Sequence, residues 1–403
     1  MKGLCLLLLT ALFFLFSPSA RGETRVMVVS DLHYMAPALC ADGALFERVL
    51  RNGDGKISQH SEELMDALLQ TVRQEKPDAL LVTGDLTFNG EKESHRALAA
   101  WFRRIEEAGT PVWVLPGNHD INTASPVGFT STGYYRTENV SPQEFSEIYA
   151  DFLLPGEANL SYLAPLSGEL YAAMTDVAFY QGQAQTFGLF TAAHGAWLRQ
   201  AIARARSEGA GVIAATHHSL LPHTDFARDS FLMFGNEGMA GALREAGVSL
   251  NLSGHLHIQH IARQDGLTDA ALGAFCVWPH RYALVDWNGG QWRYEARSLE
   301  EGALPEGFLA QSEAWFAGIT REKTLASLAE ASPEDASAMA DYAARFNLAY
   351  FSGAYRPEDP SWRQDPAYAL WGRQESSGFW QYMCMVMEEA QGNNLQAQKE
   401  NQE

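Results

Sequence analysis

The sequence contains few cysteines and few basic residues, and each shortage excludes a class of protein. Only 4 of its 403 residues are cysteine, and no two have the Cys-x-x-Cys spacing, so neither a thiolate zinc site nor a disulfide-framed fold is expected. Lys and Arg number 29 against 49 Asp and Glu, a formal net charge of −20. Because such a charge repels phosphate backbones, no nucleic-acid duplex is expected as a partner. The hydrophobic content of 46% nevertheless supplies a packed core.

The N-terminal segment 1–22 has the features of a signal peptide. One charge at Lys2 precedes an apolar run from Leu4 to Phe16, and small residues follow at Ala20 and Gly22. The run is too short to span a bilayer comfortably. We therefore predict an exported protein, whether secreted, periplasmic or at the cell surface, with no stable membrane span after cleavage. An uncleaved N-terminal anchor is the alternative.

The pairing of the cysteines stays open. Cys5 lies in the signal segment, which leaves Cys40, Cys276 and Cys384. An odd number permits at most one disulfide and one free thiol. The sequence does not name the pair.

Helical patterns that alternate with short apolar runs indicate an α/β protein. Apolar residues recur at helical spacing over 62–76 and 94–108, and two more helices are expected at 196–207 and 238–246. Five short, mostly apolar runs have the length and composition of buried, mostly parallel strands. They cover residues 26–29, 79–82, 112–115, 212–215 and 248–252.

Polar residues follow each of these runs directly. They are Ser30-Asp31-Leu32-His33, Thr83-Gly84-Asp85, Pro116-Gly117-Asn118-His119-Asp120, Thr216-His217-His218 and Ser253-Gly254-His255-Leu256-His257. In open α/β sheets ligands bind outside the carboxyl ends of the strands, so five strands would bring these side chains to one place. The first and last motifs each contain an i, i+2 pair of donors. In an extended backbone such pairs point to the same side, so each pair can bind one ion.

These donors are oxygen and imidazole groups without a thiolate, which suits a borderline metal such as Mn, Fe or Zn. Seven donors exceed what one ion needs, and a carboxylate such as Asp85 can bridge two ions. Two ions about 3.5–4 Å apart can clamp the attacking and leaving oxygens of a displacement at phosphorus. Taken singly, each motif has an ordinary alternative as a surface turn or a buried structural group. Their joint occurrence at five strand ends favours the metal site.

With this pattern the sequence resembles the calcineurin-like metallophosphoesterase superfamily, over about residues 25–290. Within that superfamily, the GDLTFNGE stretch at 84–91 and the 38-residue step from His217 to His255 are most similar to the class III cyclic-nucleotide phosphodiesterase branch. The resemblance implies an α/β fold in four layers, a β-sandwich flanked by helices. The alternation of helices and strands described above fits this fold.

The resemblance also implies roles for individual residues. Ligands of the first metal would be Asp31, His33 and His257, the bridge would be Asp85, and ligands of the second metal would be Asn118, His217 and His255. His119 would act with Asp85 in catalysis, by stabilising or protonating the departing oxygen, while a hydroxide that bridges the metals attacks. His218 would support its neighbour. In many relatives an Asp three residues after the bridging Asp orients the catalytic histidine, but Phe88 stands here, so Asn89 or Asp120 would have to substitute.

An insertion at about 37–58 follows the first motif and could overhang the metal site. Within it, Asn52-Gly53-Asp54-Gly55-Lys56-Ile57 resembles the middle of an EF-hand loop. Leu50 and Ser61 occupy the first and twelfth ligand positions, so the bidentate carboxylate is missing. An ordinary polar turn is therefore favoured over a calcium site.

After Glu300 the sequence indicates helices without strands. Ser332-Pro333 begins one helix that Gly353 ends, and another contains Phe379 and Val386. We predict a signal peptide at 1–22, a phosphoesterase domain at 23–300, a small helical C-terminal domain at 301–391 and a disordered tail at 392–403. The C-terminal helices could pack on the larger domain, contact substrate or mediate a homo-oligomer.

The resulting hypothesis is an exported phosphoesterase with two divalent or trivalent metal ions (Mn, Fe or Zn). Its substrate would be a small phosphodiester of cyclic-nucleotide type. A phosphomonoesterase or broad-specificity phosphatase with the same two-metal site is the alternative among enzymes. A non-catalytic binding protein that metal stabilises is the alternative from another class.

Overall fold

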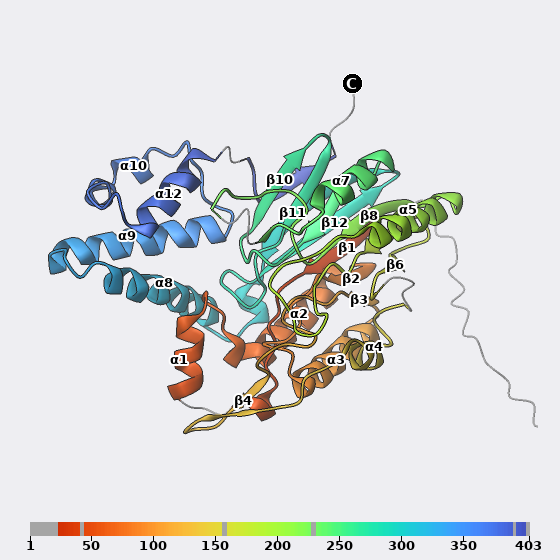
Figure 1. Ribbon diagram of the computed structural model, residues 1–403, viewed down its shortest axis with the longest axis horizontal. Coiled ribbons are helices and arrows are strands. Elements are labelled where there is room, and N and C mark those ends of the chain that lie inside the picture. Colours follow the sequence, from red (N-terminus) through yellow and green to blue (C-terminus); the bar gives the residue numbers. More distant parts are fainter. Residues whose placement is uncertain (1–22, 41–43, 155–158, 227–230, 390–391, 400–403) are drawn as a thin grey trace, which may run out of the picture.

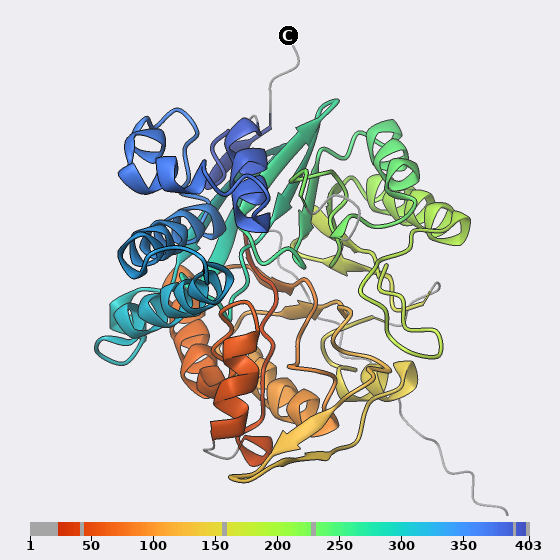
Figure 2. The same cartoon turned by 60° about the vertical axis from the view of Figure 1, so that its left-hand side comes forward.

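A computed structural model describes residues 23–40, 44–154, 159–226, 231–389 and 392–399. The predicted signal segment, residues 1–22, lies outside the described residues. Two six-stranded sheets and a two-stranded hairpin form the β structure. Figures 1 and 2 show the two sheets face to face, with helices on the outside.

The first sheet has the strand order β14-β13-β12-β1-β2-β3. Its strands are β1 (Thr24–Val29), β2 (Ala79–Val82), β3 (Val112–Val114), β12 (Arg281–Asn288), β13 (Gln291–Ser298) and β14 (Gln396–Gln398). Strands β1, β2 and β3 are parallel, and β12 runs antiparallel beside β1.

The second sheet has the order β10-β11-β9-β8-β7-β6. Its strands are β6 (Tyr162–Pro165), β7 (Leu170–Met174), β8 (Gly211–Ala215), β9 (Leu250–Ser253), β10 (His260–Gln264) and β11 (Leu267–Ala271). Strands β7, β8, β9 and β11 are parallel neighbours, and β6 and β10 are antiparallel edges. The five predicted strands are thus all present, within two residues of the expected bounds.

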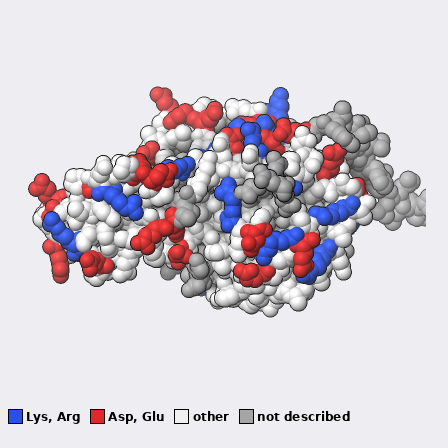
Figure 3. Space-filling view, turned by 90° about the horizontal axis from the view of Figure 1, so that it is seen from above, with Lys and Arg blue, Asp and Glu red and all other residues white. Residues whose placement is uncertain are grey.

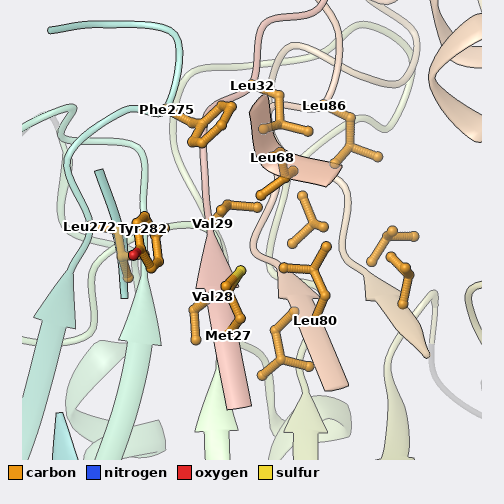
Figure 4. Packing of buried hydrophobic residues seen from close by; sticks show 14 of the residues in the cluster. Met27, Val28, Val29, Leu32, Leu68, Leu80, Leu86, Leu272, Phe275 and Tyr282 are labelled. Carbon is orange, nitrogen blue, oxygen red and sulfur yellow. The ribbon is translucent and has the colours of Figure 1, made fainter. Parts of the chain in front are cut away.

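The core lies between the sheets and under the helices. Met27, Val28 and Val29 of β1 are fully buried, and Figure 4 shows them packed between Leu80 of β2 and Tyr282 of β12. Side chains from both sheets belong to this one cluster. Burial on both faces explains why β1 and β2 read as unbroken apolar runs rather than as alternating patterns.

Helices cover the outer faces of both sheets. On the first sheet these are α2 (Ser61–Glu75) and α3 (Lys92–Glu107), and on the second α5 (Ala192–Ser207) and α7 (Asn236–Glu245). The four predicted helices are these four. The expected four-layer α/β sandwich of the metallophosphoesterase fold is confirmed.

The remaining helices and strands before residue 304 are short. They are η1 (Pro37–Leu39), α1 (Ala44–Asn52), η2 (Ser58–His60), the hairpin β4 (Val127–Phe129) and β5 (Tyr134–Arg136), α4 (Pro142–Ile148) and η3 (Glu301–Ala303).

A helical region follows the sandwich, as the sequence predicts. It consists of α8 (Phe308–Ser327), α9 (Pro333–Phe351), α10 (Ser361–Gln364), α11 (Pro366–Trp371) and α12 (Gly378–Glu388). Tyr342, Phe346 and Met383 are buried in its own cluster, which also takes in Leu256 and Ile258 of the sandwich. The C-terminal helical region is therefore packed against the sandwich at the loop that follows β9.

The predicted disordered tail is wrong for residues 392–399. Strand β14 pairs antiparallel with β13, with Ala397 opposite Tyr294. The buried Asn394 side chain accepts a hydrogen bond from the backbone N–H of Ile261 at 3.1 Å. Backbone and amide hydrogen bonds hold this segment, and a polar composition gives no apolar periodicity that would reveal them.

Two further expectations concern sulfur and membranes. No disulfide links any two of Cys40, Cys276 and Cys384. None of the helices in the described ranges is both long and apolar enough to cross a membrane. Figure 3 shows acidic and basic side chains interspersed on one face of the molecule.

Candidate metal centre

The predicted donors leave the carboxyl ends of β1, β2, β3, β8 and β9 and meet at one edge of the sandwich. Asp31, His33, Asp85, His255 and His257 all have positive φ angles, between 40° and 68°. Left-handed backbone is costly for residues with a Cβ and clusters at functional sites. The sequence-based expectation of an extended backbone at these pairs is therefore wrong: each donor is turned inward at a sharp left-handed bend.

Two groups of acidic and imidazole side chains result, and each could hold a metal ion. The first contains Asp31, His33, Asp85 and His257, and the second contains Asp85, His217 and His255. Within a group, ligand atoms lie within 4.8 Å of one another, and all of these residues are buried. Asp85 belongs to both groups.

Short contacts define the first group. The Nε2 atoms of His33 and His257 lie 3.1 Å apart. Asp85 Oδ2 is 3.5 Å from His33 Nε2, and Asp31 Oδ1 is 3.3 Å from His257 Nε2. Nitrogen lone pairs and carboxylate oxygens thus converge on a small volume, which is the arrangement that a cation requires.

The second group lies on the other oxygen of Asp85. Oδ1 of this carboxylate is 3.3 Å from His217 Nε2, which in turn is 3.1 Å from Asn118 Oδ1. His255 Nε2 is buried and has no hydrogen-bond partner within the described ranges. A buried nitrogen without a partner is costly unless something binds it, so the donor set fits a metal ion here as well.

His255 and His257 fall into different groups, although they are two residues apart. The expectation that each i, i+2 pair binds one ion is therefore wrong for this pair, while Asp31 and His33 do stay together. The imidazoles of His255 and His257 join different groups that share Asp85. The roles that the family resemblance implies for these residues, with Asn118 as a further ligand of the second metal, stay predictions.

Glycines allow the loops to approach this closely. A methyl group on Gly117 would lie 2.2 Å from Asp85 Oδ1, and one on Gly84 would lie 2.5 Å from His217 Nδ1. Gly84 also has a φ of 102°. Larger residues at these positions would push the shared carboxylate or His217 out of place.

The electrostatics of the centre separate the imidazoles into two kinds. Burial lowers the pKa of His33 and of His255 well below the ordinary value, so both stay neutral. Burial opposes protonation of His217 and His257 too, but the neighbouring Asp85 and Asp54 carboxylates raise the pKa of each to about 9. Burial alone would raise the pKa of Asp85, yet the surrounding imidazoles hold it well below its usual range. Buried negative charge here attracts positive charge.

Comparison with known protein families shows the family to which the chain belongs. Residues 24–259 match the family described as "Calcineurin-like phosphoesterase", which is more than half of the chain. The chain belongs to the calcineurin-like phosphoesterase family. Residues 307–393 match a second family, described as "C-terminal domain of cyclic nucleotide phosphodiesterase". The members of the first family are metallophosphoesterases, and the Asp and His residues of this chain are arranged for a metal site.

Individual relatives are distant from this calcineurin-like phosphoesterase. A "Probable cyclic nucleotide phosphodiesterase" of a Synechococcus strain is 39% identical over 54 residues. That match spans 13% of this chain and one fifth (20%) of the relative's own length. The structure of a dimetal phosphatase from Danio rerio is similar in fold, with a TM-score of 0.50 and 14% identity over 69% of this chain and 96% of the other.

His119, the histidine of the family's GNH motif, lies at the mouth of the centre. Its ring is partly exposed and makes an edge contact with His33, with 5.0 Å between centroids. Its backbone N–H donates to Asp85 Oδ1 at 2.9 Å. Its Nδ1 has no hydrogen-bond partner within the described part of the chain.

Neither proposed substitute orients this imidazole. The Asp120 carboxylate instead accepts hydrogen bonds from the backbone N–H groups of Leu86, Thr87 and Gly117, at 2.7–3.0 Å. It therefore joins the loop after β2 to the loop after β3. The Asn89 side chain donates to the carbonyl of Ser125 at 2.6 Å. The expectation that Asn89 or Asp120 orients His119 is wrong, because both side chains hydrogen-bond to backbone groups instead.

Sequence reasoning missed the contact of Asp54 with a predicted ligand, and it placed His218 only as a support for His217. Asp54 in the insertion contacts His257 Nδ1, and its other carboxylate oxygen is 3.1 Å from Lys56 Nζ. The insertion therefore reaches the metal centre through the turn at 52–56. In the sequence this turn resembled only a fragment of an EF-hand loop. The ring of the buried His218 packs against that of His255 at a tilt of 47°, with 4.3 Å between centroids, and its Nε2 is 3.1 Å from the carbonyl oxygen of Thr186. A separation of 203 residues gives no local signal for the Asp54 contact.

Proposed function

We propose that this protein hydrolyses phosphodiesters at a two-metal site. The observation that carries the proposal is the position of Asp85, whose two carboxylate oxygens face two separate groups of imidazoles. A carboxylate in that position can bridge a pair of ions, and a pair of ions suits displacement at phosphorus. The formal charge of the chain is −20, so bound cations would supply the positive charge that a phosphoester substrate needs.

The division of labour follows from the geometry. Asp31, His33 and His257 would hold the first metal, Asn118, His217 and His255 the second, and Asp85 would bridge them. When bound, the ions would withdraw electron density from phosphorus and acidify the attacking water. His119 is partly exposed beside His33, so it can reach the departing oxygen of a bound ester and give it a proton.

Two findings support a diester, and specifically a cyclic nucleotide, as the substrate. The match over residues 307–393 is to a domain described for cyclic nucleotide phosphodiesterases, and the distant Synechococcus relative bears a related name. Monoesters share the same two-metal chemistry. The substrate class therefore rests on these two similarities rather than on the metal groups.

The deciding experiment compares two chromogenic esters. The metal-free protein is reconstituted with Mn, Zn or Fe and assayed with bis(p-nitrophenyl) phosphate and with p-nitrophenyl phosphate. A metal-dependent preference for the diester is expected, and cyclic nucleotides would then be tested. A preference for the monoester would favour the phosphomonoesterase, and no hydrolysis with any metal would favour a binding protein.

Substitution of the shared carboxylate tests the bridge directly. Asp85→Asn keeps the shape of the side chain but removes the charge that both ions would share. We expect the loss of at least one metal per chain and a fall in turnover of at least about a hundredfold, since the removed charge is buried. Plasma mass spectrometry measures the metal content. Normal metal content and activity in the variant would contradict the bridging role.

We also propose that the protein is exported. The support is the charge at Lys2 followed by the apolar run that ends at Phe16. Expression of the full chain in a bacterial host, with fractionation and mass analysis of the N-terminus, tests it. A cytosolic protein that keeps residues 1–22 would contradict export.

A further inference from the structure

The turn at residues 52–56 brings a carboxylate to the back of a proposed metal ligand. Asp54 Oδ2 contacts Nδ1 of His257, and Nε2 of the same imidazole faces Asp31 and His33 across 3.3 and 3.1 Å. The ring is thus engaged on both nitrogens. A carboxylate behind a ligating imidazole fixes the ring orientation and leaves the Nε2 lone pair directed at the metal.

Lys56 and the backbone complete the turn on its other side. The Lys56 ammonium is 3.1 Å from Asp54 Oδ1, so the carboxylate lies between a lysine and a histidine. The backbone N–H of Ile57 donates to the carbonyl of Cys276 at 3.0 Å, which ties the turn to the segment before β12. The Asp54 side chain is still 37% exposed, so its placement depends on what holds the turn.

Helix α8 of the C-terminal region holds the turn from outside. The Lys323 ammonium donates to the carbonyl oxygens of Asn52 and Gly53, at 3.2 and 2.6 Å. The Phe316 ring packs on Gly55, where a methyl group would lie 2.3 Å from its Cδ2 atom. Gly55 has a φ of 96°, so both the conformation and the contact require glycine at this position.

Further contacts secure α8 to the sandwich on both sides of the turn. Arg51, at the end of α1, pairs with Glu322 at 2.9 Å and lies over the Trp315 ring at 4.6 Å. Ser312, at the start of α8, is 2.9 Å from Nε2 of the buried His280. Figures 1 and 2 show α8 beside α1. Contacts along one side of the helix therefore fix the turn between α1 and the metal centre.

We propose that Asp54 is a positioning residue for His257, and that α8 of the C-terminal helical region keeps Asp54 in place. This role rests on the proposed two-metal function. It links the C-terminal helical region to the first metal site, although none of the proposed metal ligands lies in that region. The C-terminal region thereby acts on the first metal site through one turn of the chain. The second site lies on the other oxygen of Asp85, and among the described residues no hydrogen bond or ion pair joins its Asn118, His217 or His255 to this turn.

The same contacts contradict the calcium alternative for this turn. The backbone carbonyls of Asn52 and Gly53 accept hydrogen bonds from the Lys323 ammonium, and the Asp54 carboxylate pairs with Lys56. Two lysines of the chain supply the positive charge at these oxygens. The resemblance to an EF-hand is therefore confined to the sequence.

The first test substitutes Asp54 in two ways. Asp54→Ala removes the contact with His257, and Asp54→Asn keeps an oxygen that can accept a hydrogen bond from Nδ1. Calorimetric titration of the metal-free protein with Mn²⁺ or Zn²⁺, together with metal analysis, measures each site. We expect the first-site affinity to fall about 10- to 100-fold in Asp54→Ala. The second site should stay filled, and Asp54→Asn should recover part of the loss.

Glu63→Ala is the matched control, because Glu63 contacts the Nδ1 of His60 at 3.2 Å outside the metal centre. It should leave both sites unchanged. Unchanged affinity in Asp54→Ala, equal losses in the two Asp54 variants, or equal weakening of both sites would overturn the positioning role. A wild-type protein that binds no metal would overturn the proposed function too, so the two failures are distinguishable.

The second test addresses α8 without touching the metal centre. Lys323 is exposed, so Lys323→Ala removes its two hydrogen bonds without creating a cavity in the core. We expect the first-site affinity to fall by about fivefold, the order of one net hydrogen bond. Lys399→Ala is the control, since Lys399 donates to the carbonyl of Gly290 at 2.8 Å, in the β12–β13 turn. Equal affinities in these two variants would overturn the role of α8.

Discussion

His119 differs from the other histidines of the centre in its exposure to solvent. Its Nδ1 has no hydrogen-bond partner within the described residues, and its ring is partly exposed. The backbone instead fixes it, through the bond from its N–H to Asp85. The partly exposed imidazole is therefore accessible to a bound substrate, as a proton donor must be.

His119→Ala should keep both metals and slow turnover most for poor leaving groups. A nitrophenolate leaves without a proton, whereas an alkoxide does not, so general acid help matters for the second kind. We expect a loss of about 100-fold or more for alkyl diesters and a smaller loss for bis(p-nitrophenyl) phosphate. Steady-state rates beside metal analysis measure both. Equal losses for the two leaving groups would contradict the role.

Glu91 carries a buried carboxyl group at the start of α3. It is fully buried, and its Oε2 accepts a hydrogen bond from the backbone N–H of Asn89 at 2.9 Å. Burial raises its pKa from 4.5 to about 7. Ionisation of Glu91 in the folded protein therefore costs stability.

The pH dependence of unfolding should report this cost. Because the folded pKa is raised, the contribution of Glu91 is fully present below pH 4.5 and is lost as the pH rises through about 7. The wild type should lose about 3 kcal/mol more than Glu91→Gln between pH 4.5 and 8. Denaturant unfolding at several pH values measures the difference. The exposed Glu93→Gln is the control, and parallel curves for wild type and Glu91→Gln would refute the assignment.

At the scale of elements, the strands visible in the sequence are those buried on both faces. Strands β1, β2 and β8 read as apolar runs because sheet and helix cover them. Edge strands such as β6, β10 and β14 mix polar and apolar residues. Their pairing depends on backbone hydrogen bonds to a neighbouring strand, which no local pattern encodes.

The last segment of the described chain provides a test at this scale. Asn394→Ala would leave the backbone N–H of Ile261 without its partner. We expect a loss of about 1–3 kcal/mol in the free energy of unfolding, the cost of a buried unpaired donor. Gln398→Ala in the exposed part of β14 should change it by less than about 0.5 kcal/mol. Equal losses of unfolding free energy in Asn394→Ala and Gln398→Ala would contradict a specific stabilising role for the Asn394 hydrogen bond.

At the scale of the whole molecule, the metal centre and folding should be coupled. Asp31 and Asp85 are at most 1% exposed in a chain with a net charge of −20. A cation that binds only the folded protein stabilises it, by about 2.7 kcal/mol at a hundred times its dissociation constant. Thermal unfolding in chelator and in Mn²⁺ should differ by a few degrees. The difference should shrink in Asp85→Asn, and an undiminished difference there would contradict binding at this centre.

The helical C-terminal region also belongs to this scale. Its helices were predicted from the sequence, and their buried Tyr342, Phe346 and Met383 form a core. The contact of that core with Leu256 and Ile258, and the hold of α8 on the turn at 52–56, were not visible. Its part in a homo-oligomer stays a prediction.

The sequence by itself determined the donor set and the layers. Side chains such as Asp31, Asp85 and His217 directly follow buried strands, and parallel strands end at one edge, so their meeting follows from local order alone. The periodicity of α2, α3, α5 and α7 likewise needs only the sequence, because amphipathic helices repeat every 3.6 residues.

Only the tertiary structure decided how these donors are shared. His255 and His257 belong to different groups, and each adopts a left-handed bend, neither of which the spacing reveals. Asp54 reaches His257 across 203 residues, and Lys323 reaches the same turn across 270. Such contacts depend on the packing of whole elements, and packing is a property of the folded chain rather than of any local stretch of it.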